Sequence, residues 1–518
     1  MKKFFYIILI VLLSGCGNFL EEYSQSLVVV KTVSDLDEIL LGEVYLPSSP
    51  VSTFSAANYA SFMNFMDDDI NTVITRRGDA NAWKTLRNLY GYSTWQLDVT
   101  KSANGSDYIN DNSLWMDSYH RINIINIILG EMSKLEIVSE EDKSNAIRIK
   151  GECYFLRAQL YFFLVNLYAL PYDNKAEKCL GVPLKLTEYV ENDFHRNTVN
   201  EVYAQIVKDL KDAVDNLTKS PQKKPAYRAS KEASLLLLSR VYLYMQDWEN
   251  ARDAANEFLE LTNELYPISS LPKTESFMEA TDSEVVFAQG TLNINRVFTA
   301  NGGDFCISND LYNLYLDNDY RRDVFFTKNF STDSIMINRK YSSTIHQAKV
   351  SDVFTLRIAE GYLNMAEACA MLDDAEANTW LNDLRRNRIA DYKDKNYAGE
   401  ELVKEIRDER RKELCLEGHR WFDLRRYSVN HKYPYSKEIV RVFAKYNEEG
   451  SSFEGAELFK LEKNDLSYVF KIPESVLEYH ADMPNNERKK RDAVAKLDEN
   501  GKVIENEDTD KDKKQLKR

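Results

Sequence analysis

Helical periodicity constrains this 518-residue chain more than any other feature of its sequence. From Ile149 to Leu167 the apolar side chains recur at alternating steps of four and three residues, which is the spacing of a single helix face. Helical patterns also cover Ala229 to Met245 and Leu356 to Ala370. Because Pro171 cannot continue a helix, it should end the first of these segments. The sequence therefore predicts a mainly α-helical fold.

Two of the helical patterns are each followed by a short break and a second helix. Gln246-Asp247 interrupts the first pattern, and Trp248 to Leu261 resumes helical spacing. Asp373-Asp374 interrupts the second, which continues to Arg388. Both hairpins resemble tetratricopeptide units, which repeat about every 34 residues in a contiguous array. Equivalent positions of the two hairpins here are 126 residues apart. We expect irregular tetratricopeptide-like helical hairpins in a single body, separated by long loop and small β insertions.

Long polar insertions lie between the helices and at the end of the chain. Residues 41–109 are rich in Asn, Ser, Asp, Tyr and Trp, and residues 269–349 contain short β-prone pieces such as Glu284–Phe287. Loops of this length inside a compact body usually carry function. Residues 487–518 are highly charged and contain no aromatic side chain, so we expect a solvated, disordered tail.

The N-terminus predicts export and a lipid anchor. Lys2 and Lys3 precede the apolar run Phe4–Leu13, which is too short to span about 30 Å of hydrocarbon and has the proportions of a signal peptide. The sequence Leu13-Ser14-Gly15-Cys16 resembles a bacterial lipobox, in which the cysteine is acylated and becomes the first residue. We expect residues 1–15 to be removed, Cys16 to be lipidated and residues 16–40 to form a tether and first segment. An ordinary secretory peptide is the alternative.

Composition and motif content exclude several classes of function. With 82 acidic residues against 67 lysines and arginines, the formal net charge is −15, which argues against nucleic acid as a partner. The sequence contains no P-loop, dinucleotide-binding, zinc-protease or serine-hydrolase motif, and no cysteines with metal-ligand spacing. We therefore expect neither a cofactor nor a metal. Cys153, Cys369 and Cys415 fall within helical patterns and should pack in the core.

Two charged stretches could suggest chemistry. Thirteen of the 22 residues from Glu405 to Arg426 are charged, but helical spacing pairs them, for instance Asp408 with Lys412. Paired-carboxylate catalysis would also need a cleft and perturbed pKa values. We interpret this stretch as structural. For Asp67-Asp68-Asp69 we expect a solvated loop, with contact to a polar ligand or a cation as the alternative.

Aromatic side chains on a polar background are the candidates for a binding site. A sugar ring presents an apolar C–H face and a rim of hydroxyls, so its receptor needs flat aromatic rings together with polar side chains. The candidate platform consists of Asn81, Trp83, Tyr90, Tyr92, Trp95 and Tyr108, with Phe305 and Tyr312 as secondary candidates. The alternative for each aromatic residue is packing in the core.

A series of short motifs runs in a fixed order behind the lipobox. They are Trp115-x-x-x-Tyr119, Gly151 to Tyr161, Gly181 to Leu184, Arg196 to Leu210, Ala229-Ser230, Leu311 to Arg321, Lys340-Tyr341, Leu356 to Ala368 and Glu409 to Arg426. In this order they resemble the SusD/RagB family of surface nutrient-binding lipoproteins of the Bacteroidota. One departure lies at the end, where Met483-Pro484-Asn485-Asn486 replaces the Gln-Asn-Pro-Gly that is usual in the family.

The resemblance implies both a fold and a function. It implies a SusD-like helical body of residues 41–486, with an N-terminal half of about 41–268 and a C-terminal half of about 269–486. It implies a non-enzymatic, lipid-anchored outer-membrane protein at the cell surface that captures a nutrient, expected to be an oligosaccharide, and delivers it to a TonB-dependent (SusC-like) transporter. Two alternatives stay open: a lipid-anchored tetratricopeptide-like scaffold that binds only proteins, and a glycoside hydrolase that uses two carboxylates.

Overall fold

A computed structural model describes most of the chain. The described residues are 30–46, 58–73, 86–106, 113–189, 194–222, 226–278, 284–290, 294, 298, 305–329, 333–341, 350–449, 452–498 and 502–504. The predicted signal peptide and Cys16 lie outside these ranges.

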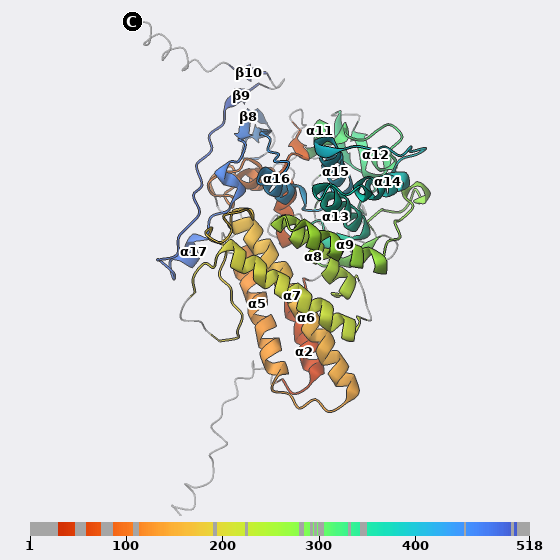
Figure 1. The fold of residues 1–518 in the computed structure, drawn as a ribbon. Helices are drawn as coiled ribbons and strands as arrows, with labels where there is room; N and C mark the ends of the chain where they lie inside the picture. Colours follow the sequence, from red (N-terminus) through yellow and green to blue (C-terminus); the bar gives the residue numbers. More distant parts are fainter. Residues whose placement is uncertain are drawn as a thin grey trace, which may run out of the picture.

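Helices dominate the structure, as the sequence predicts. The long ones are α5 (Ser113–Met132), α6 (Glu140–Tyr168), α7 (Val199–Lys219), α8 (Lys231–Met245), α9 (Trp248–Leu261), α13 (Ile358–Met371), α14 (Glu376–Arg388) and α15 (Gly399–Glu413). Helices that are consecutive in this series pack against one another from α5 through α9, and α9 then packs against α13. The result is the curved stack of helix pairs in Figure 1.

The two predicted hairpins are confirmed, and local sequence explains their corners. Gln246 ends α8 in a left-handed conformation with φ of 61°, and the Asp247 side chain accepts a hydrogen bond from the backbone N–H of Asn250 at the start of α9. The second hairpin consists of α13 and α14. The predicted helix before Pro171 is α6, which ends at Tyr168.

The two hairpins are neighbours in space despite their separation in sequence. Helices α9 and α13 approach so closely that a Cβ atom at Gly361 would lie 2.5 Å from a ring carbon of Phe258. Only glycine, whose side chain is a single hydrogen atom, therefore fits at position 361 of this crossing. The hairpins form one continuous stack, and the insertion between them leaves the stack and returns to it.

The folded body starts before residue 41. Helix α2 (Val33–Ile39) and the π-helical turn η1 (Leu40–Val44) pack onto α5 and α6, with Leu36 and Leu40 fully buried. Arg148 and Arg228 both bind the carboxylate of Asp37, with the Arg148 Nη2 atom 3.0 Å from Asp37 Oδ2. The expected boundary at residue 41 therefore moves to the start of α2.

The described residues form three small sheets outside the long helices. One has the strand order β1 (Ile70–Thr72), β3 (Phe305–Ile307), β5 (Ser334–Ile337), β4 (Phe326–Asn329), and a second pairs β2 (Val285–Ala288) with β6 (Thr355–Arg357). The third has the order β10 (Val503–Ile504), β9 (Ala495–Leu497), β8 (Phe453–Leu461), β7 (Ile439–Tyr446). All pairs are antiparallel. The β-prone piece Glu284–Phe287 is confirmed as β2.

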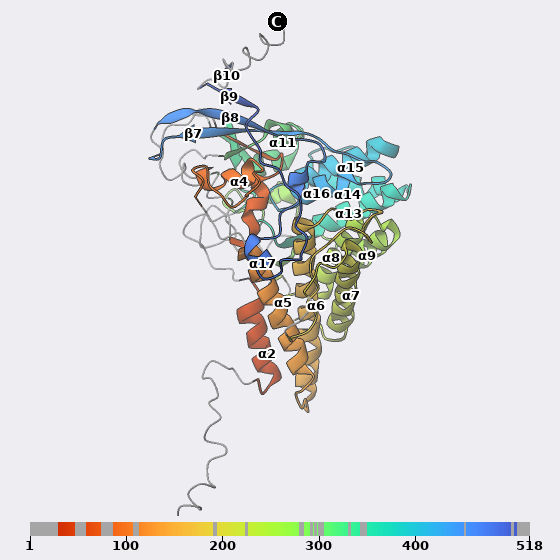
Figure 2. The ribbon, with the colours of Figure 1, turned by 90° about the vertical axis from the view of Figure 1, so that its left-hand side faces the viewer.

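Short helices complete the described elements. They are η2 (Asn58–Phe65), α4 (Tyr90–Ser93), η3 (Ile268–Ser270), α11 (Asn309–Tyr312), α12 (Tyr320–Phe325), α16 (Arg420–Ser428), η5 (Leu466–Tyr468) and α17 (Glu474–Leu477). In Figure 2, α4 and strands β7 to β9 lie at the end of the molecule opposite α2. We call this the β-rich end.

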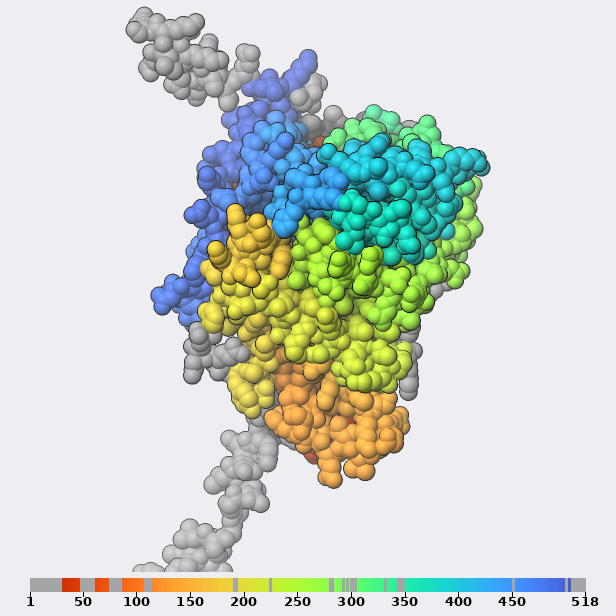
Figure 3. All heavy atoms as spheres, viewed as in Figure 1, coloured from red at the N-terminus to blue at the C-terminus, as the bar shows by residue number. Residues whose placement is uncertain are grey.

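The C-terminal segment is ordered much further than the sequence suggests. Asn486 donates from Nδ2 to the carbonyls of Tyr168 (2.6 Å) and Phe470 (2.7 Å), so it satisfies the carbonyl of the last residue of α6 and ties it to the C-terminal segment. Beyond it the chain runs along the side of the molecule and adds β9 and β10 to the β7–β8 sheet, as the blue segment in Figure 3 shows. This corrects the expectation of a disordered tail for residues 487–498 and 502–504.

Two smaller observations complete the fold. Cys153, Cys369 and Cys415 are free and buried, as predicted. Within the described ranges, no helix combines the length and the apolar character needed to cross a membrane.

Candidate functional site

Two members of the expected aromatic platform are core residues. Trp95 has no exposed surface, its indole N–H donates to the carbonyl of Met66 at 2.7 Å, and the guanidinium of Arg441 lies 5.5 Å from its ring. Tyr92 is 2% exposed and stacks on Phe62, with ring centroids 4.4 Å apart. Neither ring has a free face for a sugar, which corrects the expectation for both residues in favour of the core alternative.

Tyr90 lies at the edge of the same core. Its ring meets Phe443 of β7 and Phe459 of β8 edge-on, with centroid distances of 5.0 and 5.8 Å. Burial, with a smaller effect of the nearby Glu457 carboxylate, raises the pKa of Tyr90 to about 12. The phenol is therefore a neutral, half-buried group. Asn81, Trp83 and Tyr108 lie outside the described residues, so the structure leaves their expected roles as predictions.

The secondary candidates are also partly accounted for by packing. Phe305 is fully buried in β3, which corrects its expected exposure. Tyr312 is half-buried in α11, and the guanidinium of Arg322 lies 4.8 Å above its ring, so one face of the ring is covered. Only the remaining face of Tyr312 can meet a ligand.

The structure brings the two candidate segments together, although more than 200 residues separate them in sequence. Strand β1 pairs with β3, so that Thr72 lies opposite Phe305. Tyr90 packs on β7, which also contacts β1. The described residues on either side of Trp83 and the described segment that begins at Phe305 therefore both lie at the β-rich end. The described candidates, which are Tyr90, Tyr92, Trp95, Phe305 and Tyr312, therefore belong to one region of the molecule rather than to two competing sites.

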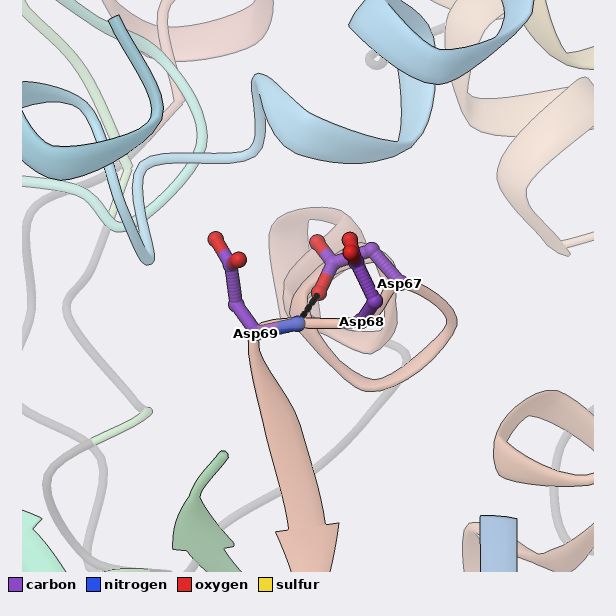
Figure 4. A group of neighbouring side chains, drawn as sticks. All are labelled: Asp67, Asp68 and Asp69. Carbon is purple, nitrogen blue, oxygen red and sulfur yellow. Dashed lines mark hydrogen bonds between the residues drawn. The ribbon is translucent and has the colours of Figure 1, made fainter. Parts of the chain in front are cut away.

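The aspartate triplet, Asp67, Asp68 and Asp69, is buried and not a solvated loop. It forms the turn that leads into β1, and Figure 4 shows its carboxylates on one side of that turn, with the backbone N–H of Asp69 donating to Asp67. All three residues are at most 6% exposed. The expectation of a solvated loop is wrong because the turn inserts between the C-terminal helices, where basic side chains meet it.

Basic side chains from the C-terminal half neutralise most of the triplet. Arg420 binds both oxygens of Asp68, at 2.7 and 3.0 Å, and Lys437 Nζ lies 2.8 Å from Asp68 Oδ2. Arg411 bridges the triplet, with contacts of 3.1 Å to Asp68 and 2.7 Å to Asp69. These contacts join the N-terminal insertion to α15 and α16.

The carboxyl groups of the triplet differ in their affinity for protons. Burial works to raise the pKa of Asp68, but Arg411 and Arg420 outweigh it and hold that pKa well below its usual value. Burial, together with the charges of Asp69 and Asp68, raises the pKa of Asp67 well above its usual value. Asp67 is therefore the carboxyl group of the triplet that holds a proton most firmly.

The triplet does not fit a metal ion, although its donor atoms are close together. Among the described residues it is the one group of His, Cys, Asp and Glu side chains whose ligand atoms all lie within 4.8 Å of one another. A divalent cation there would have to displace the three cations that already bind Asp68 and Asp69, or it would be repelled by them. The chemistry of this donor set is that of an internal ion network.

The charged stretch Glu405–Arg426 is structural, as predicted, although its pairs differ from the expected ones. Asp408 pairs with Lys404, and Lys412 pairs with Glu409. At its centre is the Glu413 cluster, in which Glu413 binds Arg321 at 2.7 Å, Arg357 at 2.6 Å and Arg388 at 3.1 Å, all fully buried or nearly so. Burial favours the protonated form, but the three arginines outweigh it and hold the pKa of Glu413 well below its usual value.

A small surface cleft lies beside Trp95, in the segment that carries the primary candidates. The stretch Leu97–Thr100, which follows the buried Trp95, forms one wall, and Phe470–Glu474 forms another. Tyr168 and Arg488 also line the cleft, which encloses about 50 Å³. Sequence reasoning missed Arg488 because a charge-rich terminal stretch without apolar periodicity is typical of a solvated tail. The available signal was the asparagine pair just before it, at the position of the family's usual close.

Two family profiles match the chain. One, described as "Starch-binding associating with outer membrane", matches residues 19–243, and the other, described as the SusD family, matches residues 325–488. Together they cover well over half of the chain, and the second ends at Arg488. A SusD-like protein of Formosa agariphila is 24% identical over 498 residues, which is 82% of this chain and 89% of that protein.

Solved structures share the fold. A SusD superfamily protein of Bacteroides thetaiotaomicron has a TM-score of 0.66 at 22% identity, covering 88% of this chain and 100% of that one. A laminarin-binding SusD-like protein has a TM-score of 0.59 at 19% identity, covering 88% and 99%. At such identities the likeness establishes the helical, tetratricopeptide-like fold alone.

Proposed function

The chain belongs to the SusD/RagB family, and from this premise we propose that it captures an oligosaccharide at its β-rich end and passes it to a TonB-dependent (SusC-like) outer-membrane transporter. The family is carbohydrate-binding and associated with the outer membrane. The observation that carries the proposal is that family profiles match both halves of the chain. The laminarin-binding relative supports a glycan as the ligand.

The positions of the α2 end and the β-rich end at opposite ends of the molecule support a receptor on the cell surface. The described chain begins at the end that carries α2, whereas the candidate segments meet at the opposite, β-rich end (Figures 1 and 2). Lipidation of Cys16 would therefore attach the protein to the membrane through the α2 end. The β-rich end would then point toward the ligand.

Neither alternative function accounts for these observations as well. A glycoside hydrolase needs two carboxyl groups in an open cleft. The most conspicuous acidic residues, Glu409, Glu413 and Asp423, are instead buried and bound to arginine or lysine. A tetratricopeptide-like scaffold that binds only proteins would explain the helices but not the carbohydrate-binding description of the family profile.

Calorimetric titration of the mature protein against a panel of glycans tests the proposal. We propose Trp83 as a stacking residue, and Trp83→Ala should weaken binding by about 1 to 3 kcal/mol, as for a central aromatic contact residue, while leaving the melting temperature unchanged. Trp95→Ala is the matched control, because it removes a core tryptophan of the same segment. Failure of every glycan to bind the wild-type protein would refute the proposed function.

The anchor has its own test. Cys16→Ala removes the thiol that we propose to be acylated, so the protein should leave the outer-membrane fraction and lose the mass of its lipid. Retention in that fraction with an unchanged mass would contradict the proposed anchor without bearing on ligand binding. Co-purification of the wild-type protein with a TonB-dependent transporter would test the proposed partner.

A further inference from the structure

The cleft beside Leu97–Thr100 contains the guanidinium group of Arg488, which forms no ion pair among the described residues. Arg488 donates from Nε to the carbonyl of Gln96 at 2.8 Å and from Nη1 to the carbonyl of Val469 at 3.2 Å. Among the described residues, no carboxylate lies within 4 Å of its guanidinium. The side chain is thus held in place by neutral groups, and the nearby carboxylates of Asp465 and Asp98 act on its charge without forming an ion pair with it.

The neighbouring basic residues differ from Arg488 in this respect. Arg491, three residues later, binds Asp465 at 2.8 Å. Lys471, which lines the same cleft, binds Glu474 at 3.0 Å. Each of these cations already has a counter-ion, so of the two cations that line the cleft, Lys471 and Arg488, only Arg488 lacks an ion pair among the described residues.

Burial reinforces the imbalance. Partial burial, and then the like charge of Arg491, lower the pKa of Arg488 to about 9. The charged form of the guanidinium is therefore less favourable than in water, but the group is still protonated at neutral pH. An anion in the cleft would relieve this cost, because an arginine binds a carboxylate or sulfate through charge-assisted hydrogen bonds in a planar geometry.

The size and walls of the cleft indicate what kind of group enters it. A volume of about 50 Å³ holds a few water-sized atoms and therefore one substituent rather than a whole sugar ring. Phe470 lies beneath Arg488, with the guanidinium carbon 5.3 Å from the ring centroid. Asp98 also lines the cleft, but it is exposed to solvent, where salt screens its repulsion.

We propose that the Arg488 cleft binds a carboxylate or sulfate substituent of the glycan, so that the protein selects acidic oligosaccharides. The inference rests on the proposed function and narrows its substrate class. The ring that carries the substituent would lie outside the cleft, toward the candidate segment at the β-rich end. Such a contact would give specificity for charge without requiring a long basic groove.

Titration of the full mature protein with matched pairs of ligands tests the inference. The pairs are oligogalacturonides with their methyl esters, and a sulfated oligosaccharide with its desulfated form. We expect the charged member of one pair to bind at least about tenfold more tightly, as for a charge-assisted bidentate contact. The pair that shows the preference identifies the substituent as carboxylate or sulfate. Arg488→Gln should abolish the preference and leave the affinity for the neutral member unchanged.

Two controls keep the test decisive. Arg491→Gln removes a nearby cation that already has its counter-ion, so the preference should survive. Arg488→Lys keeps the charge and should retain part of the preference if Arg488→Gln melts early. Neutral glycans that bind without any charge preference, or a preference that survives in Arg488→Gln, would overturn this inference alone. Absence of binding to both members of every pair would overturn the inference, and only failure of the whole glycan panel would remove the proposed function as well.

Discussion

Two clusters of buried carboxyl groups meet α15, and they handle their charge in different ways. Glu413, the last residue of α15, binds three arginines. The aspartate triplet receives Arg411 from the same helix, but its cations are concentrated on Asp68, and among the described contacts none of them reaches the Asp67 carboxylate. The pKa of Glu413 is therefore lowered, whereas that of Asp67 is raised.

This difference shows that burial does not by itself set the state of an acidic side chain. Both carboxyl groups are almost completely removed from water. A buried carboxylate stays ionised where several guanidinium groups touch it, and it takes up a proton where its nearest neighbours are other carboxylates. Glu413 and Asp67 should consequently respond in opposite directions to mutation and to pH.

The largest expected effect is at Glu413. Glu413→Ala leaves Arg321, Arg357 and Arg388 buried without their shared partner, and removing one member of a buried ion pair costs about 3 to 5 kcal/mol. We expect a loss at or above the upper end of that range in chemical unfolding, with ligand binding affected only through unfolding. Asp408→Ala is the control, because its pair with Lys404 is exposed and worth less than about 1 kcal/mol. Normal stability with lost binding would overturn the structural role of Glu413.

A somewhat smaller loss is expected at Trp95, whose indole N–H binds the residue just before the triplet. Trp95→Ala would leave a cavity and an unpaired carbonyl at Met66, and such changes cost about 3 to 5 kcal/mol. Relaxation of the long side chains of Arg441 and Arg491 over the gap should keep the loss near the lower end. Thermal unfolding measures it. A variant that melts normally but binds glycan poorly would instead indicate that Trp95 contacts the ligand.

The fold was largely predictable because its helices carry their own periodic signal. The stretches that form α6, α8, α9, α13 and α14 carry apolar residues at helical spacing, and polar residues such as Asp247 mark their ends. The joining of α9 to α13 was less predictable, because the insertion of residues 262–357 between the hairpins carries no information about where the chain returns to the stack. Gly361 is the residue that permits the contact, and a single glycine in a helical pattern is a weak signal.

The candidate site was predicted less well, for a physical reason. The aromatic and acidic residues of the N-terminal insertion look exposed in sequence because their neighbours are polar and lack periodicity. Trp95 and Asp68 are nonetheless buried, because their partners Arg441, Arg411 and Arg420 come from more than 300 residues away. Sequence patterns report local contacts, whereas this end of the molecule is built from long-range ones.

The subtlest expected effect separates two neighbours within the triplet. Because the pKa of Asp67 is higher in the folded protein than its ordinary value of 3.8, the folded state binds more protons than the unfolded chain at pH values between the two. Stability contributed by protonated Asp67 is therefore present at low pH and lost as the pH rises through the folded-state pKa. Asp68 has a lowered pKa, so its contribution is present above pH 3.8 and lost as the pH falls.

Asparagine substitutions make this opposition measurable. Asp67→Asn mimics the protonated carboxyl group and keeps an oxygen for the Asp69 N–H, so it should raise the melting temperature at pH 8 and lose that advantage below about pH 4, where Asp67 is protonated in both states. Asp68→Asn, the matched control, should lower the melting temperature at pH 8, since it removes the anion that Arg411, Arg420 and Lys437 share. Melting curves of both variants and of the wild-type protein, recorded from below the ordinary pKa of 3.8 up to pH 8, test the prediction. If both substitutions destabilise the protein equally at pH 8, Asp67 is ionised in the folded state and the contrast between the two clusters is wrong.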